Sequence, residues 1–118
     1  MRLSTRPTKR AAGRILGWLS IRGHMLENTT RDFQLNPYIP VTSQTPPTFL
    51  LQAEDDPVDT VKNSLVYYAA LKKAGVPAEM HLYPHGGHAF GLRRTKFPIT
   101  GWPDLVQAWL RTIGMIQN

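Results

Sequence analysis

Residues 48–83 read TFLLQAEDDPVDTVKNSLVYYAALKKAGVPAEMHLY, and this stretch decides the fold. It opens with a short apolar run at 48–53 that is followed at once by acidic residues, as is typical of a strand buried on both faces. It closes with AEMHLY at 78–83, which alternates polar and apolar residues like a strand near a sheet edge and stops at Pro84. We therefore predict two strands, 48–53 and 78–83.

A helix is predicted between these strands, from about residue 60 to residue 74. Lys72 and Lys73 favour the negative C-terminal end of such a helix, and Gly75 with Pro77 supplies a stop signal. Asp59 stands where it can cap the first turn. The apolar positions that recur at helical spacing are Val61, Leu65, Tyr68 and Ala69, with Leu71 a weaker member.

Strand, helix and strand in this order predict a parallel βαβ unit, so the fold class is α/β. A closing helix is expected to begin at Pro103, with one apolar face formed by Leu105, Val106, Trp109, Leu110 and Ile113. Two parallel strands cannot cover both of their faces and edges. The unit therefore looks like the end of a larger sheet, and its exposed edge could pair with a partner or with another copy of the chain.

The composition describes one globular domain of 118 residues with 42% hydrophobic and 19% charged residues. The absence of cysteine excludes disulfides, thiol nucleophiles and cysteine-based metal sites. No apolar stretch reaches the roughly 18 residues that a membrane span needs, so we expect no membrane partner.

The net charge of +6 is confined to one end of the chain. Residues 1–26 hold six basic and no acidic side chains, whereas residues 27–118 hold eight of each. The excess therefore belongs to a basic leader rather than to a face of the folded body, and nucleic acid is not an expected partner. Two other roles of this leader stay open: it could contact phosphates, or it could be a transit peptide.

The apolar run at 15–21 makes a poor secretory signal, because it is short and is followed by Arg22. The compartment therefore stays open between cytoplasmic and secreted.

Acidic residues follow the first predicted strand, and a histidine lies in the glycine-rich loop after the second. The carboxyl ends of parallel strands are where sites form in open α/β sheets. A carboxylate on one ring nitrogen of a histidine fixes its tautomer and leaves the other nitrogen free to accept a proton from a hydroxyl. We expect Asp56 to orient His88 in this way, with Asp55 or Glu54 as alternatives, which makes the base half of a serine hydrolase. Residues without a Cβ at 86 and 87 would allow the tight loop that this needs.

Other polar clusters have competing interpretations. His81, His85 and His88 could suggest a metal, but they lack the helical pairing of HExxH-type sites, and we expect neither a metal nor a cofactor. The basic cluster 93–96 is either solvated or meets an anionic or sugar-rich substrate. Trp102 and Trp109 are expected to pack against the core rather than to stack on a sugar.

Three motifs carry a resemblance to a known family. PPTFLLQAEDDPVD at 46–59, AGVPAE at 74–79 and YPHGGHAFG at 83–91 resemble the C-terminal part of an α/β-hydrolase, in the branch of acetyl esterases and acetylxylan esterases near dienelactone hydrolase and prolyl oligopeptidase. The similarity spans roughly residues 34–114. It implies the C-terminal part of an α/β-hydrolase sheet and a carboxylic-ester hydrolase that acts on a small-molecule or carbohydrate ester. It also implies that Asp56 and His88 are the acid and the base of the catalytic triad.

The sequence departs from this family at the nucleophile. None of its four serines lies in a G-x-S-x-G elbow, and Ser20 is the nearest imitation, with glycines three positions away. We expect residues 27–118 to be a partial hydrolase domain whose elbow and oxyanion hole lie elsewhere, residues 1–26 to be a foreign start read through a frameshift, and the chain alone to be inactive. The alternative is a non-catalytic fragment or a self-associating binding module.

Overall fold

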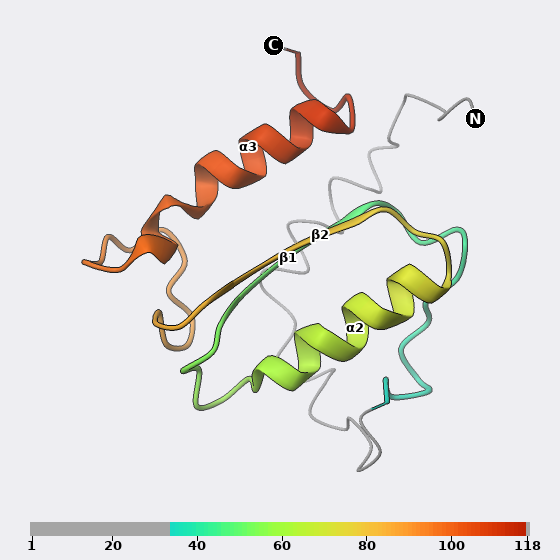
Figure 1. Ribbon diagram of the computed structural model, residues 1–118, viewed down its shortest axis with the longest axis horizontal. Helices are drawn as coiled ribbons and strands as arrows, with labels where there is room; N and C mark the ends of the chain where they lie inside the picture. Colours follow the sequence, from blue (N-terminus) through green and yellow to red (C-terminus); the bar gives the residue numbers. More distant parts are fainter. Residues whose placement is uncertain (1–33, 118) are drawn as a thin grey trace.

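The computed structural model of the chain describes residues 34–117. In chain order its elements are β1 (Thr48–Ala53), α2 (Val61–Lys73), β2 (Ala78–Tyr83), the 3₁₀ helix η1 (Pro98–Gly101) and α3 (Trp102–Thr112), drawn in Figure 1. The basic leader 1–26 lies outside the described residues. No helix of the described part is long and apolar enough to cross a membrane.

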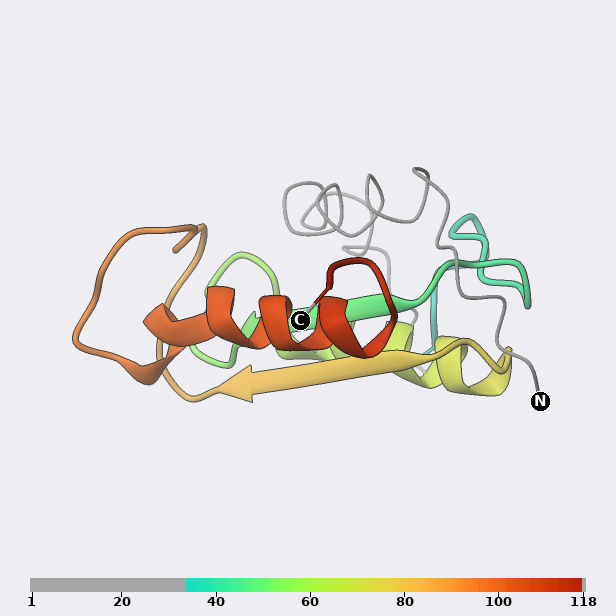
Figure 2. The same ribbon diagram turned by 90° about the horizontal axis from the view of Figure 1, so that it is seen from above.

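The two strands lie side by side and run parallel, as Figure 2 shows from above. Thr48 is opposite Ala78 and Ala53 is opposite Tyr83, so partners are 30 positions apart along the whole ladder. All six residues of β1 are buried, and all six of β2 are half-buried. The predicted bounds of both strands, the burial of the first and the edge character of the second are confirmed.

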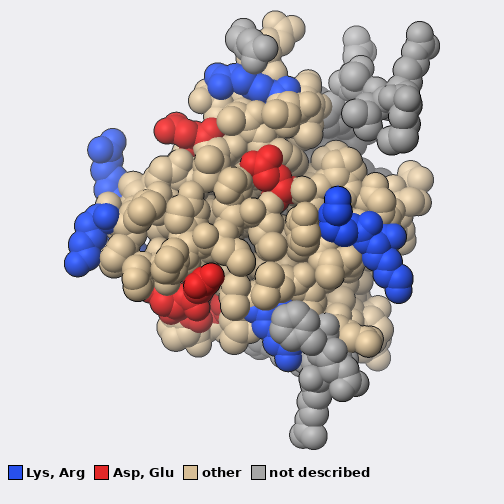
Figure 3. Space-filling model, in the orientation of Figure 1, with Lys and Arg blue, Asp and Glu red and all other residues tan. Residues whose placement is uncertain are grey.

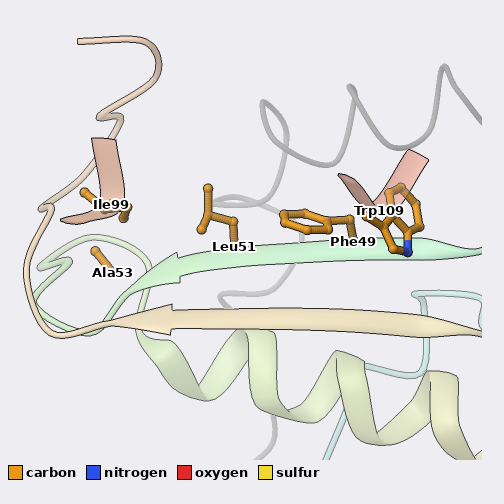
Figure 4. Packing of buried hydrophobic residues seen from close by; sticks show 5 residues of the cluster. All are labelled: Phe49, Leu51, Ala53, Ile99 and Trp109. Carbon is orange, nitrogen blue, oxygen red and sulfur yellow. The ribbon is translucent and has the colours of Figure 1, made fainter. Parts of the chain in front are cut away.

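The two helices cover opposite faces of this sheet, which lies between them in Figure 1. One face packs Leu50 against Tyr67 and Leu71 of α2. The other face carries Phe49, Leu51 and Ala53 of β1, with Ile99 of η1 and Trp109 of α3 above them, as seen in Figure 4. The α/β class, with a parallel βαβ unit and a closing helix, is confirmed.

The closing helix follows its predicted pattern closely. It begins at Trp102, one residue before the expected start, with Pro103 in its first turn. Trp109 is 4% exposed and its ring centroid lies 5.5 Å from that of Phe49. The other members of the apolar face, Leu105, Val106, Leu110 and Ile113, are partly buried against the same cluster.

The buried face of α2 differs from the predicted stripe. Its buried residues are Asn63, Ser64, Val66, Tyr67 and Leu71. Of the predicted positions only Leu71 is fully buried, and Ala69 is exposed. The reason is a buried polar contact: the Ser64 hydroxyl donates to Gln52 Oε1 of β1 at 2.5 Å, so a polar position of the helix faces the sheet.

Gln52 also holds the segment that enters α2. Its Nε2 donates to the backbone carbonyl of Asp59 at 2.6 Å. The residue preceding the helix is Thr60, and no side chain caps its first turn. The expected capping role of Asp59 is therefore wrong, because its side chain faces the neighbouring loop instead.

Within the described residues β2 pairs only with β1, which leaves the second edge of β2 without a partner strand. That the unit is the end of a larger sheet stays a prediction. Self-association through that edge stays a prediction.

We predict that Ser64→Ala destabilises the fold. Ser64 is 0% exposed and Gln52 is 5% exposed, so the change leaves a buried acceptor unpaired, at a cost of about 1–3 kcal/mol. Urea unfolding followed by circular dichroism measures this loss. Ser43→Ala, at an exposed position, is the control and should lie within about 0.5 kcal/mol of the parent chain. Equal midpoints for the two variants would contradict the role given to the Ser64–Gln52 contact.

Candidate active site

The loops that follow β1 and β2 lie together at one end of the sheet, at the lower left in Figure 1. Acidic side chains gather at the corresponding end in Figure 3. The contacts between these loops join residues 29 to 32 positions apart, close to the 30-residue offset of the strand ladder. The register of the sheet therefore decides which residues of the two loops meet.

A tight turn separates the three consecutive acids after β1. The backbone N–H of Glu54 donates to the carbonyl of Tyr83 at 2.7 Å, so strand pairing continues for one residue past Ala53. The N–H of Asp56 then donates back to the carbonyl of Ala53 at 3.4 Å. Because the chain turns here, Asp55 and Asp56 reach different parts of the loop that carries the histidine.

Asp56 and His88 lie within hydrogen-bonding distance. His88 Nδ1 is 3.1 Å from Asp56 Oδ2 and 3.2 Å from Oδ1. Asp56 Oδ1 also accepts from the backbone N–H groups of Val58 and Asp59, at 2.8 and 2.9 Å. The carboxylate is therefore held by its own turn and is only 9% exposed, whereas the His88 side chain is 42% exposed.

The other ring nitrogen of His88 makes no hydrogen bond to the described part of the chain. With Nδ1 donating to Asp56, Nε2 carries the lone pair and can accept a proton from a hydroxyl. The arrangement can thus act as a general base supported by a carboxylate. The sequence placed both residues in these two loops, and the structure brings them together.

Asp55 contacts the glycines of the histidine loop rather than the histidine itself. Its Oδ1 accepts from the backbone N–H groups of Gly86 and Gly87, at 3.0 and 2.8 Å. Its Oδ2 lies 3.5 Å from Nδ1 of His85. The pKa of Asp55 is lowered, chiefly by the hydrogen bond from the Gly87 amide. His85 and the amide of Gly86 also lower the pKa, whereas desolvation raises it. The sequence analysis missed this contact, and Glu54, the other alternative orienter, is exposed.

Asp59 joins the pair at a longer distance. Its Oδ2 lies 3.7 Å from Nδ1 of His88, and its Oδ1 is buried without a hydrogen-bond partner among the described residues. Ligand atoms of Asp56, Asp59 and His88 all lie within 4.8 Å of one another, so this group could hold a metal ion. This group differs from the three histidines considered from the sequence, His81, His85 and His88, and shares only His88 with them. His81 Nε2 lies instead 2.7 Å from Glu79 Oε1.

The loop around His88 needs residues that tolerate unusual backbone angles. Gly87 and Gly91 have φ of 67° and 51°, and Ala89 has φ of 53°. Gly86 is required for another reason: a Cβ there would lie 3.0 Å from that of Ala53 and 2.8 Å from Ile99 Cδ1. The two neighbouring glycines thus serve different needs, one steric and one conformational.

The segment after this loop is attached to α3. The indole Nε1–H of Trp102 donates to the carbonyl of Gly91 at 2.7 Å. Trp102 also packs against the core cluster, as expected. The basic cluster 93–96 is exposed at Arg93, Arg94 and Lys96, and Lys96 Nζ lies 5.5 Å from the centre of the Phe97 ring.

A parallel βαβ unit with a carboxylate–histidine pair beyond its strands defines part of an α/β-hydrolase. Comparison with known proteins agrees: residues 14–113 match the prolyl oligopeptidase family, and the chain belongs to it. The resemblance stated from the motifs is confirmed.

Solved structures and a curated relative extend this assignment. The acetyl ester-xyloside bifunctional hydrolase of Caldicellulosiruptor lactoaceticus is 45% identical, with a TM-score of 0.63 over 65% of this chain and 28% of its own. The carboxylesterase Cest-2923 of Lactobacillus plantarum WCFS1 is 27% identical, with a TM-score of 0.61 over 66% of this chain and 32% of its own. The acetylxylan esterase of Xylanibacter ruminicola is 42% identical over 48 residues, which are 40% of this chain and 10% of that protein. The match thus covers about a tenth of the length of the curated relative.

We expect Gly86→Ala to destabilise the chain. The added Cβ has no room beside Ala53 and Ile99, and overpacking of this kind costs about 1–3 kcal/mol. Thermal and urea unfolding measure the change. Gly101→Ala is the matched control, because no atom lies within 4 Å of a Cβ there. An unchanged stability of Gly86→Ala would show that the loop is not packed against Ala53.

The contact between Asp55 and the glycine amides should depend on pH. Since the pKa of Asp55 is lowered in the folded chain from its ordinary 3.8, the contact stabilises the fold above that value and is lost as pH falls through the lower folded-state pKa. NMR shifts of the Gly86 and Gly87 amide protons should report a midpoint below 3.8. His85→Ala should move this midpoint upward without reaching 3.8, because the Gly87 amide is the larger cause. A parent midpoint at or above 3.8 would contradict the assignment.

Proposed function

We propose that this chain supplies the acid and the base of a serine-type carboxylic-ester hydrolase, with Asp56 orienting His88. The observation that carries the proposal is the contact of His88 Nδ1 with the Asp56 carboxylate at 3.1 Å. The Nε2 atom of His88 is then the group that accepts the proton of the nucleophilic hydroxyl and later delivers it to the leaving alcohol.

The nucleophile must come from outside the described residues. Ser64 is fully buried and its hydroxyl donates to Gln52. Ser43 precedes β1, so the length of a six-residue strand, on the order of 16 Å, separates it from the carboxyl ends where the pair lies. No serine of the sequence has glycines two positions away on both sides. We therefore propose that the elbow and the oxyanion hole belong to a polypeptide segment not contained in these 118 residues.

The proposed substrate is an acetyl ester of a carbohydrate. The support is that a relative 45% identical to this chain is an acetyl ester-xyloside hydrolase and that one 42% identical over 48 residues is an acetylxylan esterase. The third relative named above is a carboxylesterase, which supports the same class of bond.

A chimera tests this proposal. Residues 34–117 replace the matching segment of the Caldicellulosiruptor lactoaceticus hydrolase, which supplies the rest of the fold. We expect the chimera to release acetate from acetylated xylose and xylan, and Asp56→Asn to lower kcat by roughly ten thousandfold, the usual effect of mis-setting the histidine tautomer. His88→Gln should lower kcat at least as much. Steady-state kinetics measures both.

Two matched variants control for the changes themselves. Asp104→Asn alters an exposed acid in the first turn of α3, and His81→Gln alters a histidine on β2, away from the loops; neither should lower kcat substantially. The 118-residue chain alone should show no acetylesterase activity above background. Full activity of the Asp56→Asn chimera, or rapid hydrolysis by the chain alone that His88→Gln abolishes, would overturn the proposal.

A further inference from the structure

The loop that carries His88 is attached to the rest of the molecule on both sides of the histidine. Before it, the amides of Gly86 and Gly87 donate to Asp55 Oδ1. After it, the carbonyl of Gly91 accepts from the indole of Trp102. Between these two attachments the chain makes a turn with positive φ at residues 87, 89 and 91.

We propose that Asp55 and Trp102 are positioning residues that hold the His88 imidazole in register with Asp56. Neither forms its hydrogen bonds with the imidazole. Each acts through the backbone next to it, Asp55 from the end of β1 and Trp102 from the first turn of α3. This inference rests on the proposed function, because holding the imidazole in place matters for catalysis only if His88 is the base.

Two features of the site make such positioning necessary. The His88 side chain is 42% exposed, so core packing does not fix its orientation. The backbone around it includes a non-glycine residue, Ala89, with φ of 53°, a conformation that costs free energy and persists only where neighbouring contacts enforce it. Hydrogen bonds to a carboxylate are stronger than neutral ones, which suits Asp55 to this task.

Asp55 and Asp56 thereby divide two roles that the sequence cannot separate. Both follow β1 and both have a partner 32 positions along the chain, Gly87 for Asp55 and His88 for Asp56. Asp55 accepts from the backbone amides of the histidine loop, whereas Asp56 accepts from the amides of its own turn and contacts the imidazole. A change at Asp55 should therefore alter the geometry of the His88 pair without removing any atom of it.

The test is the tautomer of His88 in the full 118-residue chain, read from the two ring nitrogen shifts by NMR at a pH where the imidazole is neutral. The parent chain should show the Nδ1–H form. Asp55→Ala should reduce the ratio of Nδ1–H to Nε2–H by about tenfold, which corresponds to losing one ordinary hydrogen bond. Trp102→Phe keeps the ring but removes the donor, and should change the ratio in the same direction.

Rescue distinguishes positioning from a general loss of structure. Asp55→Asn retains an oxygen that accepts from the Gly86 and Gly87 amides, so its ratio should lie between those of Asp55→Ala and the parent. Glu54→Ala removes the adjacent exposed carboxylate and should leave the ratio unchanged. Amide shifts of α2, on the opposite face of the sheet, report whether each variant is folded. Where Asp55→Ala does not fold, Asp55→Asn and Trp102→Phe decide the outcome.

The possible results separate the two proposals. If the parent does not favour Nδ1–H, or Asp56→Ala leaves the ratio unchanged, the pairing proposed for the function fails. If Asp56→Ala alters the ratio but folded Asp55 and Trp102 variants keep the parent value, the pairing stands and the positioning roles are overturned.

Discussion

The site depends on the parallel register of β1 and β2. Because partners are 30 positions apart from Thr48 to Ala53, the residues just past each strand are brought together with similar offsets of 29 to 32. A slip of one residue would turn every side chain of a strand to the other face and would also change which residues of the two loops meet. The register is held by the complete burial of β1 between α2 and α3. The packing that buries β1 therefore also fixes the alignment of Asp56 with His88.

The sequence predicted the elements whose apolar residues form a run, an alternation or a stripe at helical spacing. The strand bounds and the apolar face of α3 followed directly from hydrophobic runs and spacing, because burying apolar side chains away from water is favourable. The buried face of α2 did not follow. Ser64 and Asn63 are polar, and they are buried in the fold. The Ser64 hydroxyl is satisfied by Gln52, a partner on another element, which no periodicity within the helix can reveal.

The site shows the same division between what spacing can and cannot predict. Strand-end topology placed Asp56 and His88 in neighbouring loops, because the carboxyl ends of parallel strands share an edge. The roles of Asp55 and Asp59 depend on the turn that begins at Ala53, where adjacent residues point in different directions. Three aspartates within the five residues 55–59 look equivalent in a sequence. In the structure Asp55 accepts from the amides of the histidine loop, Asp56 contacts the imidazole, and Asp59 lies farther from the same ring.

The contacts that fix the proposed acid and the proposed base all lie within residues 55–102. Asp56 is held by the amides of its own turn, and the His88 loop is attached to the end of β1 and to α3. A general base is effective when it is oriented before the reaction, because no free energy is then lost in arranging it. These attachments make no use of a nucleophile or an oxyanion hole. The geometry of the pair therefore arises from the βαβ unit and its closing helix themselves, and a hydroxyl brought to this edge of the sheet would meet an imidazole that is already oriented.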